Sequence, residues 1–147
     1  MIRVAKAREL SAYIDVETVC PETVSIDVDR LQAFLAVSGD RQAIHLPVAD
    51  RAAVIPANLL LAVSPAALQS GLQVSAFKAC FTAGYRKIRF LETVTVGQAM
   101  ELYYTISSVR HLRRKTYVVL RLELRDKSSA QKLAEFWQTD VYIDADG

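Results

Sequence analysis

Two residues between positions 38 and 45 carry side chains that can move protons near neutral pH. Asp40 and His45 lie five positions apart, and His45 is one of only two histidines among the 147 residues. A carboxylate held beside an imidazole can orient a water molecule while the imidazole accepts its proton. The spacing alone also fits a turn aspartate followed by an unrelated histidine. The elements around the pair decide between these interpretations.

A short helix is predicted over residues 28–37, directly before the pair. Asp27 is a suitable N-cap, and apolar residues recur on one face at positions 28, 31, 34 and 35. Ser38-Gly39 ends the helix, because glycine readily takes the conformation at which helices stop. We therefore expect Asp40 at a helix exit, exposed to whatever packs above it.

A second helix is predicted from Ile55 to Ser70, with Pro56 in its first turn and Pro65 as a kink or a break. Apolar residues occur on all its sides, which predicts a helix buried by a surface that wraps around it. Strands are predicted over residues 77–90, 99–109, 117–125 and 133–143, the first of them with a bulge or break at Gly84.

Residues 12–19 alternate loosely and suggest an edge strand that ends before Pro21. The order of elements favours an α+β fold in which a curved antiparallel sheet wraps around one long buried helix.

Composition indicates a globular protein, with 52% hydrophobic and 23% charged residues, and residues 1–147 are most simply one domain. The formal charge of +2 is too small to favour a nucleic-acid partner. The apolar run from Ala52 to Leu68 is too short and too broken to span a bilayer. Cys20 and Cys80 lack metal-ligand spacing, so we expect no metal and a reducing, cytoplasmic location.

Three segments resemble the MaoC-like, (R)-specific enoyl-CoA hydratase family, and most closely its nodulation-protein-N-like branch. The most specific runs from Phe34-Leu-Ala-Val-Ser-Gly-Asp40 to Ile44-His45 and is similar to the family signature F-A-x-x-S-G-D-x-N-P-I-H. Ile55–Val63 is similar to the start of the family's central helix. Tyr85-Arg-Lys-Ile-Arg-Phe90 followed by Val94–Gly97 is similar to Y-G-x-x-x-V-R-F and a P-V-x-x-G turn.

This resemblance implies the hot-dog fold and a lyase that hydrates a 2-enoyl thioester, or dehydrates a 3-hydroxyacyl thioester, carried on CoA or acyl-carrier protein. Asp40 and His45 are implied to hold and deprotonate the water that adds to C3. The thioester carbonyl is implied to lie at the start of the central helix, where backbone N–H groups stabilise developing negative charge. No cofactor beyond the thioester carrier is implied.

Further site residues follow from the same resemblance. Asn58 stands where the family's helix has the glycine that acts as oxyanion donor, so the resemblance implies it for that role, although a capping role at the helix start is the favoured interpretation. Ser64 is assigned to a hydroxyl found further down the family's helix. Arg113 and Arg114 have the charge to contact CoA phosphates, although a solvated hairpin tip is the favoured interpretation for them.

The sequence departs from the family at Gln42-Ala43, at Pro47 and in a shorter loop between His45 and Ile55. Two alternatives therefore stay open beside the hydratase. One is a non-catalytic hot-dog module that binds an acyl thioester or a partner subunit, and the other is a thioesterase. We expect a homodimer or a larger homo-oligomer, because the family's sites lie near the dimer interface.

Overall fold

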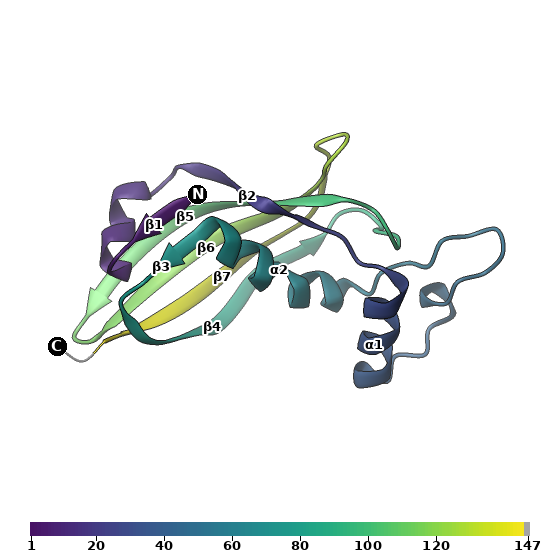
Figure 1. The fold of residues 1–147 in the computed structure, drawn as a ribbon, viewed down its shortest axis with the longest axis horizontal. Coiled ribbons are helices and arrows are strands. Elements are labelled where there is room, and N and C mark those ends of the chain that lie inside the picture. Colours follow the sequence, from purple (N-terminus) through teal and green to yellow (C-terminus); the bar gives the residue numbers. More distant parts are fainter. Residues whose placement is uncertain (146–147) are drawn as a thin grey trace.

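The computed structural model describes residues 1–145, in which a curved main sheet carries helices on one side and at one end (Figure 1). Its strands are β1 (Ile2–Val4), β2 (Glu17–Val24), β3 (Leu72–Val74), β4 (Phe77–Phe90), β5 (Met100–Leu112), β6 (Lys115–Asp126) and β7 (Lys132–Asp144). Its α-helices are α1 (Val28–Ser38) and α2 (Ala57–Gly71), and its 3-10 helices are η1 (Ala7–Tyr13) and η2 (Ala43–His45).

The main sheet is antiparallel, with strand order β2-β5-β6-β7-β4, and β1 pairs in parallel with β3 in a separate small sheet. The long strands alternate as predicted: Leu102 and Ile106 of β5 and Leu120 of β6 are fully buried, whereas residues between them are partly exposed. The buried residues form the core between the sheet and α2. Tyr104 ties the two layers together, because its hydroxyl donates to the carbonyl of Gly71 at 2.8 Å.

The predicted α2 is one continuous helix, with Pro65 inside it. Its buried residues are Leu59, Leu60, Ser64, Ala67, Leu68 and Gly71. The opposite side is exposed at Ala62, Ala66 and Gln69. The prediction that α2 is buried on all sides was therefore wrong for the single chain. Alanine is compatible with both the buried and the exposed side of a helix. Counting the alanines as apolar therefore overestimated how much of α2 is buried.

The predicted edge strand over residues 12–19 was also misplaced. Residues 7–13 form η1 instead, and the edge strand β2 runs from Glu17 to Val24 through Pro21. The register of β2 against β5 shifts between Val19 and Thr23, so Pro21 lies in a bulge of an edge strand, where proline's missing N–H costs no ladder bond. The irregularity predicted at Gly84 is present in β4, where the register shifts between Thr82 and Gly84.

Within residues 1–145, no helix combines the length and the apolar character needed to cross a membrane.

Candidate active site around Asp40 and His45

The end of α1 places Asp40. The helix begins where the side chain of Asp27 accepts the backbone N–H of Arg30 at 2.8 Å, as predicted for an N-cap. It ends at Gly39, which has φ +71° and donates its N–H to the carbonyl of Leu35 at 2.9 Å. A left-handed residue turns the chain sharply away from the helix axis. Asp40 therefore leaves the helix end and faces the loop that follows.

Asp40 and His45 are in contact, as the sequence predicted. The Oδ2 atom of Asp40 lies 3.4 Å from Nε2 of His45, with the Asp40 side chain 30% exposed and the His45 side chain 6% exposed. The other carboxylate oxygen, Oδ1, accepts the backbone N–H of Gln42 at 3.0 Å. This bond fixes the carboxylate so that one oxygen remains directed at the imidazole.

The imidazole of His45 is oriented by a backbone group on the far side of the loop. Its Nδ1 lies 2.6 Å from the carbonyl oxygen of Val54. A carbonyl oxygen can only accept, so Nδ1 carries the hydrogen and the neutral ring has its lone pair on Nε2. The backbone supports this geometry, because Val54 also donates its N–H to the carbonyl of Ile44 at 2.9 Å.

When His45 is neutral, two acceptors face each other: a carboxylate oxygen of Asp40 and the Nε2 lone pair of His45. Such a pair is stabilised by a molecule that donates a hydrogen to each, and water is the smallest molecule that does so. A water held in this way gives up a proton to the imidazole most readily, because the carboxylate stabilises the imidazolium that results.

The pair opens into a cavity of about 480 Å³ at the start of α2. Ala57 and Asn58, the first residues of the helix, line this cavity together with Phe90. The first amides of a helix have no carbonyl partner within it, and the N-cap here, Pro56, provides no side-chain acceptor. The cavity therefore combines a proton-transfer pair with a helix start, where the backbone dipoles favour negative charge.

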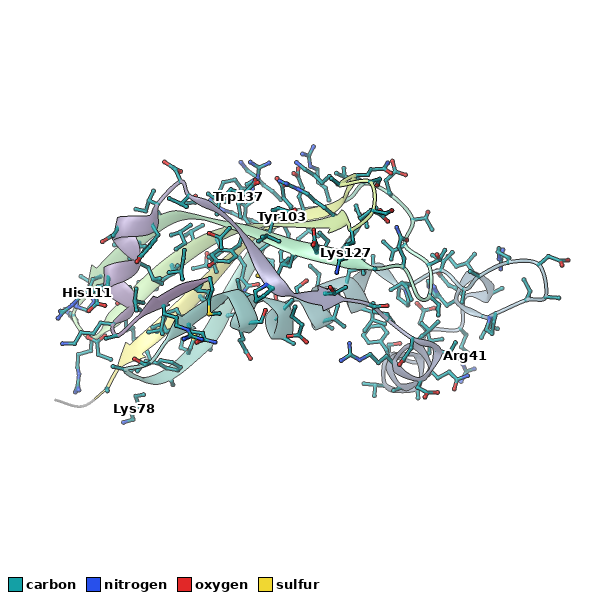
Figure 2. All side chains as sticks on the ribbon, turned by 45° about the horizontal axis from the view of Figure 1, so that its top comes forward. Arg41, Lys78, Tyr103, His111, Lys127 and Trp137 are labelled. Atoms are coloured by element: carbon teal, nitrogen blue, oxygen red, sulfur yellow. The ribbon has the colours of Figure 1, made fainter. Side chains whose placement is uncertain are left out.

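The other sequence-predicted residues lie elsewhere. The hydroxyl of Ser64 is buried and donates to the carbonyl of Leu60 at 2.7 Å, so it bonds within the helix, and it does not line this cavity. Arg113 and Arg114 form the exposed tip of the β5–β6 hairpin, which was the structural alternative for them. Figure 2 shows His111, next to that tip, at the opposite end of the molecule from Arg41, which follows Asp40.

Sequence reasoning missed the backbone atoms that complete the site. The carbonyl of Val54 sets the tautomer of His45, and the amide of Gln42 orients Asp40. No side-chain type signals such roles, because every residue but proline carries the same backbone groups. The wall formed by residues 90–94 was also missed, although Phe90 ends a segment that the resemblance includes.

Neither a family model nor a curated protein matches the sequence. Solved structures do match. An (R)-hydratase from A. caviae involved in PHA biosynthesis is 15% identical, with a TM-score of 0.66 over 86% of this chain and 94% of that chain. A C-terminally truncated HadBC (3R-hydroxyacyl-ACP dehydratase) complex from Mycobacterium tuberculosis is 12% identical, with a TM-score of 0.69 over 88% of this chain and 96% of that chain.

A conserved hypothetical protein from Mycobacterium tuberculosis with a double hotdog fold is 14% identical, with a TM-score of 0.67 over 88% of this chain and 42% of that chain. At such identities the comparisons establish the fold and not the activity. The nodulation-protein-N-like branch stays a prediction. The curved antiparallel sheet, the central helix and these neighbours together confirm that the chain has the hot-dog fold.

Proposed function

We propose that the protein is a lyase that adds water to a 2-enoyl thioester, or removes it from a 3-hydroxyacyl thioester. The observation that carries this proposal is the contact between Asp40 and His45 at the start of α2. Asp40, His45 and the first two residues of the helix, Ala57 and Asn58, line one cavity. Two fold neighbours described as a hydratase and a 3R-hydroxyacyl-ACP dehydratase add support.

In the hydration direction, Nε2 of His45 takes a proton from a water that Asp40 orients. The water oxygen bonds to C3 of the enoyl group, and the electron pair of the C2–C3 double bond moves toward the thioester oxygen. The amides of Ala57 and Asn58 stabilise this charge, each contributing about 3–4 kcal/mol by analogy with measured oxyanion donors. The proton on His45 then passes to C2. Dehydration follows the same steps in reverse.

The substrate is a thioester on CoA or on acyl-carrier protein, and the reaction needs no other cofactor, because water and the two side chains supply every proton moved. The free thiols of Cys20 and Cys80 fit a reducing compartment, in agreement with a cytoplasmic protein.

The test is hydration of crotonyl-CoA, followed by loss of the enoyl absorbance, for the wild type and for Asp40→Asn and His45→Asn. Asparagine at 45 keeps an N–H for the Val54 carbonyl but has no basic nitrogen, and asparagine at 40 keeps an oxygen for the Gln42 amide. We expect each substitution to lower kcat by roughly 10²–10⁴. Activity that survives both substitutions contradicts the mechanism.

Two further measurements separate the alternative functions. Asn58 is exposed and places a side chain at the helix start, which is the observation that favours a binding module. Thermal stabilisation by crotonyl-CoA or butyryl-CoA without turnover identifies such a module. Release of free CoA thiol identifies a thioesterase.

We also propose that the protein is a homodimer or a larger homo-oligomer that assembles through β4. This strand is at the edge of the main sheet, and all 14 of its residues are exposed. They include large apolar side chains, Phe81, Tyr85 and Ile88 among them. A long edge strand with exposed apolar side chains is a template for pairing with another strand. Light scattering at micromolar concentration should give at least twice the mass of one chain, and a monomeric mass contradicts this proposal.

A further inference from the structure

A second and larger cavity, of about 670 Å³, lies beyond the candidate active site. It is bordered by the last turns of α2, by β3, and by the first half of β4 where that strand pairs with β7. Its apolar lining comes from Pro65, Leu68, Leu72, Phe77 and Phe81. None of the residues that border the cavity around Asp40 and His45 also borders this one.

Polar side chains also border the cavity, and three of them, Thr82, Gln138 and Asp140, form a hydrogen-bonded cluster on β4 and β7. The other polar residues of the lining are Arg3, Gln69, Gln73, Ser75 and Tyr142. Gln138 is 3% exposed and Asp140 is 6% exposed. On the neighbouring strand β6 they face Leu120 and Val118, which are fully buried. An ordinary core would continue this apolar face across β7, because burying a carboxylate carries a large desolvation penalty.

The carboxylate of Asp140 is held by two neutral donors. The hydroxyl of Thr82 donates to its Oδ1 at 2.9 Å, and the side-chain amide of Gln138 donates to the same oxygen at 2.8 Å. Burial raises the pKa of Asp140, and these two hydrogen bonds act against that rise. Both donors reach one oxygen, and among the described residues no donor reaches Oδ2.

The second oxygen is accessible from the cavity. Within residues 1–145, every fully buried side-chain nitrogen or oxygen has a hydrogen-bond partner. Because Oδ2 of Asp140 has none, it is not fully buried, and Asp140 borders the cavity. The cavity thus presents apolar residues beside a carboxylate whose Oδ2 atom accepts no hydrogen bond from the described residues.

We propose that this cavity is a binding site for an apolar chain tipped with a hydrogen-bond donor, an ammonium or a hydroxyl group, which donates to Oδ2 of Asp140. The apolar part of the ligand packs against Leu68, Leu72 and Phe81. The donor at the tip bonds to Oδ2, whereas the donors of the protein, Thr82 and Gln138, both bond to Oδ1. An ammonium also neutralises the buried charge, so it binds more tightly than a hydroxyl of the same chain length. Arg3, the cation that borders the cavity, is exposed to solvent and so screened.

This site lies along the same helix as the candidate active site. From Asn58 to Leu68 the helix rises by about 15 Å at 1.5 Å per residue. The donor-tipped chain therefore has two sources: a separate small molecule, or the remote end of an acyl thioester whose carbonyl lies at the helix start. The second source rests on the proposed function, and the first does not.

The test is titration of the ¹⁵N-labelled full chain with hexylammonium, 1-hexanol and hexane, followed by NMR. We expect saturable shifts of the backbone amides of Thr82, Gln138, Asp140 and Tyr142 with the first two probes, hexylammonium binding more tightly. Asp140→Asn keeps the shape of the side chain and removes its charge, and we expect it to weaken hexylammonium binding by about tenfold or more. Asp144→Asn, on the same strand but outside the cavity, is the matched control and should bind as the wild type does.

Three results overturn the proposal: no saturable shifts at these residues in the wild type, equal binding of hexane and hexylammonium, or unchanged hexylammonium binding in Asp140→Asn. The wild-type titration decides the matter even where the variant fails to fold. The source is then separated by competition with 12-hydroxydodecanoyl-CoA. Displacement of hexylammonium assigns the site to the remote end of an acyl chain, and simultaneous binding assigns it to a separate ligand. Crotonyl-CoA is too short to reach this cavity, so hydration activity is tested independently of it.

Discussion

The proton-transfer pair depends on backbone contacts as much as on its two side chains. His45 accepts through Nε2 because Nδ1 donates to the carbonyl of Val54 at 2.6 Å. Asp40 directs one oxygen at the ring because the other accepts from Gln42 at 3.0 Å. Each contact restricts the rotation of one side chain before water binds. The entropy cost of ordering that side chain is then not added to the reaction barrier, so we expect each contact to contribute to kcat.

The contact from Gln42 can be removed by a substitution that suits the backbone angle of this residue. Gln42 has φ −64°, which is the angle that proline imposes, so Gln42→Pro deletes the N–H and leaves the φ of residue 42 as it is. We expect kcat for hydration to fall by about tenfold or more, because a hydrogen bond to a charged group contributes about 1.5–3 kcal/mol. Gln42→Ala keeps the N–H and should react as the wild type does. Equal rates in the two variants would show that this contact does not position Asp40.

The sequence predicted the two side chains of the site but not their supports. The Asp40 and His45 contact followed from spacing and from the family resemblance, and Asn58 was placed correctly at the helix start. The carbonyl of Val54 could not be predicted, because its role depends on where the loop of residues 46–54 returns to the site. Ser64 was assigned by position along the helix alone, and it bonds instead to Leu60 of its own helix.

Among the elements, α1 matters through Gly39, the residue that caps its C-terminal end. Gly39 has φ +71°, a conformation that costs an L residue roughly 1–2 kcal/mol, although asparagine tolerates it better. We expect Gly39→Ala to lower the free energy of unfolding by about that amount and Gly39→Asn to lower it less. Urea denaturation measures both. An alanine variant as stable as the wild type would mean that the turn before Asp40 relaxes easily.

The junction of α2 with β2 is the tightest contact that a glycine makes in the described part of the chain. A Cβ atom at Gly71 would lie 2.6 Å from Sγ of Cys20 and 3.1 Å from its Cα. The backbone Cα cannot move aside, so we expect Gly71→Ala to destabilise the protein by about 1–3 kcal/mol. Thermal or urea unfolding gives the value. Gly84→Ala is the matched control, because no atom lies within 4 Å of its added Cβ; equal losses in both variants would contradict the packing argument.

The long strands and α1 were predictable because their patterns are strong and local. Buried and exposed residues alternate in β5 and β6, and Asp27 marks the start of α1. Errors arose where tertiary context decides. Pro21 was interpreted as the end of a strand, but at a bulge on the sheet edge its missing N–H is tolerated. The exposed side of α2 could not be recognised, because alanines at 62 and 66 are compatible with either environment.

In the whole molecule, β4 borders both cavities and is also the strand of the proposed interface. Phe90 at one end borders the cavity around Asp40, and Phe81 borders the cavity around Asp140. A second copy paired along this strand would therefore lie beside both. The proposed interface could not be predicted from the sequence pattern of β4, which is typical of an ordinary half-buried strand. Only the strand order of the sheet shows that β4 lies at an edge.

Assembly through β4 can be tested with a charge on its exposed side. Ile88 is 39% exposed, and a lysine there would be desolvated in a strand-to-strand interface. We expect Ile88→Lys to shift the light-scattering mass from the oligomer toward the single chain. Val37→Lys, on α1 and 89% exposed, should leave the mass unchanged. An oligomer that persists in Ile88→Lys would place the interface elsewhere.

The most direct measurement of the central claim is a double-mutant cycle on crotonyl-CoA hydration with Asp40→Asn, His45→Asn and the combined variant. If the two side chains act on one water, removing either removes the function of both, so the combined variant should be about as slow as the slower single one. Losses that multiply would indicate independent roles. A wild type that hydrates crotonyl-CoA no faster than the combined variant would contradict the account outright.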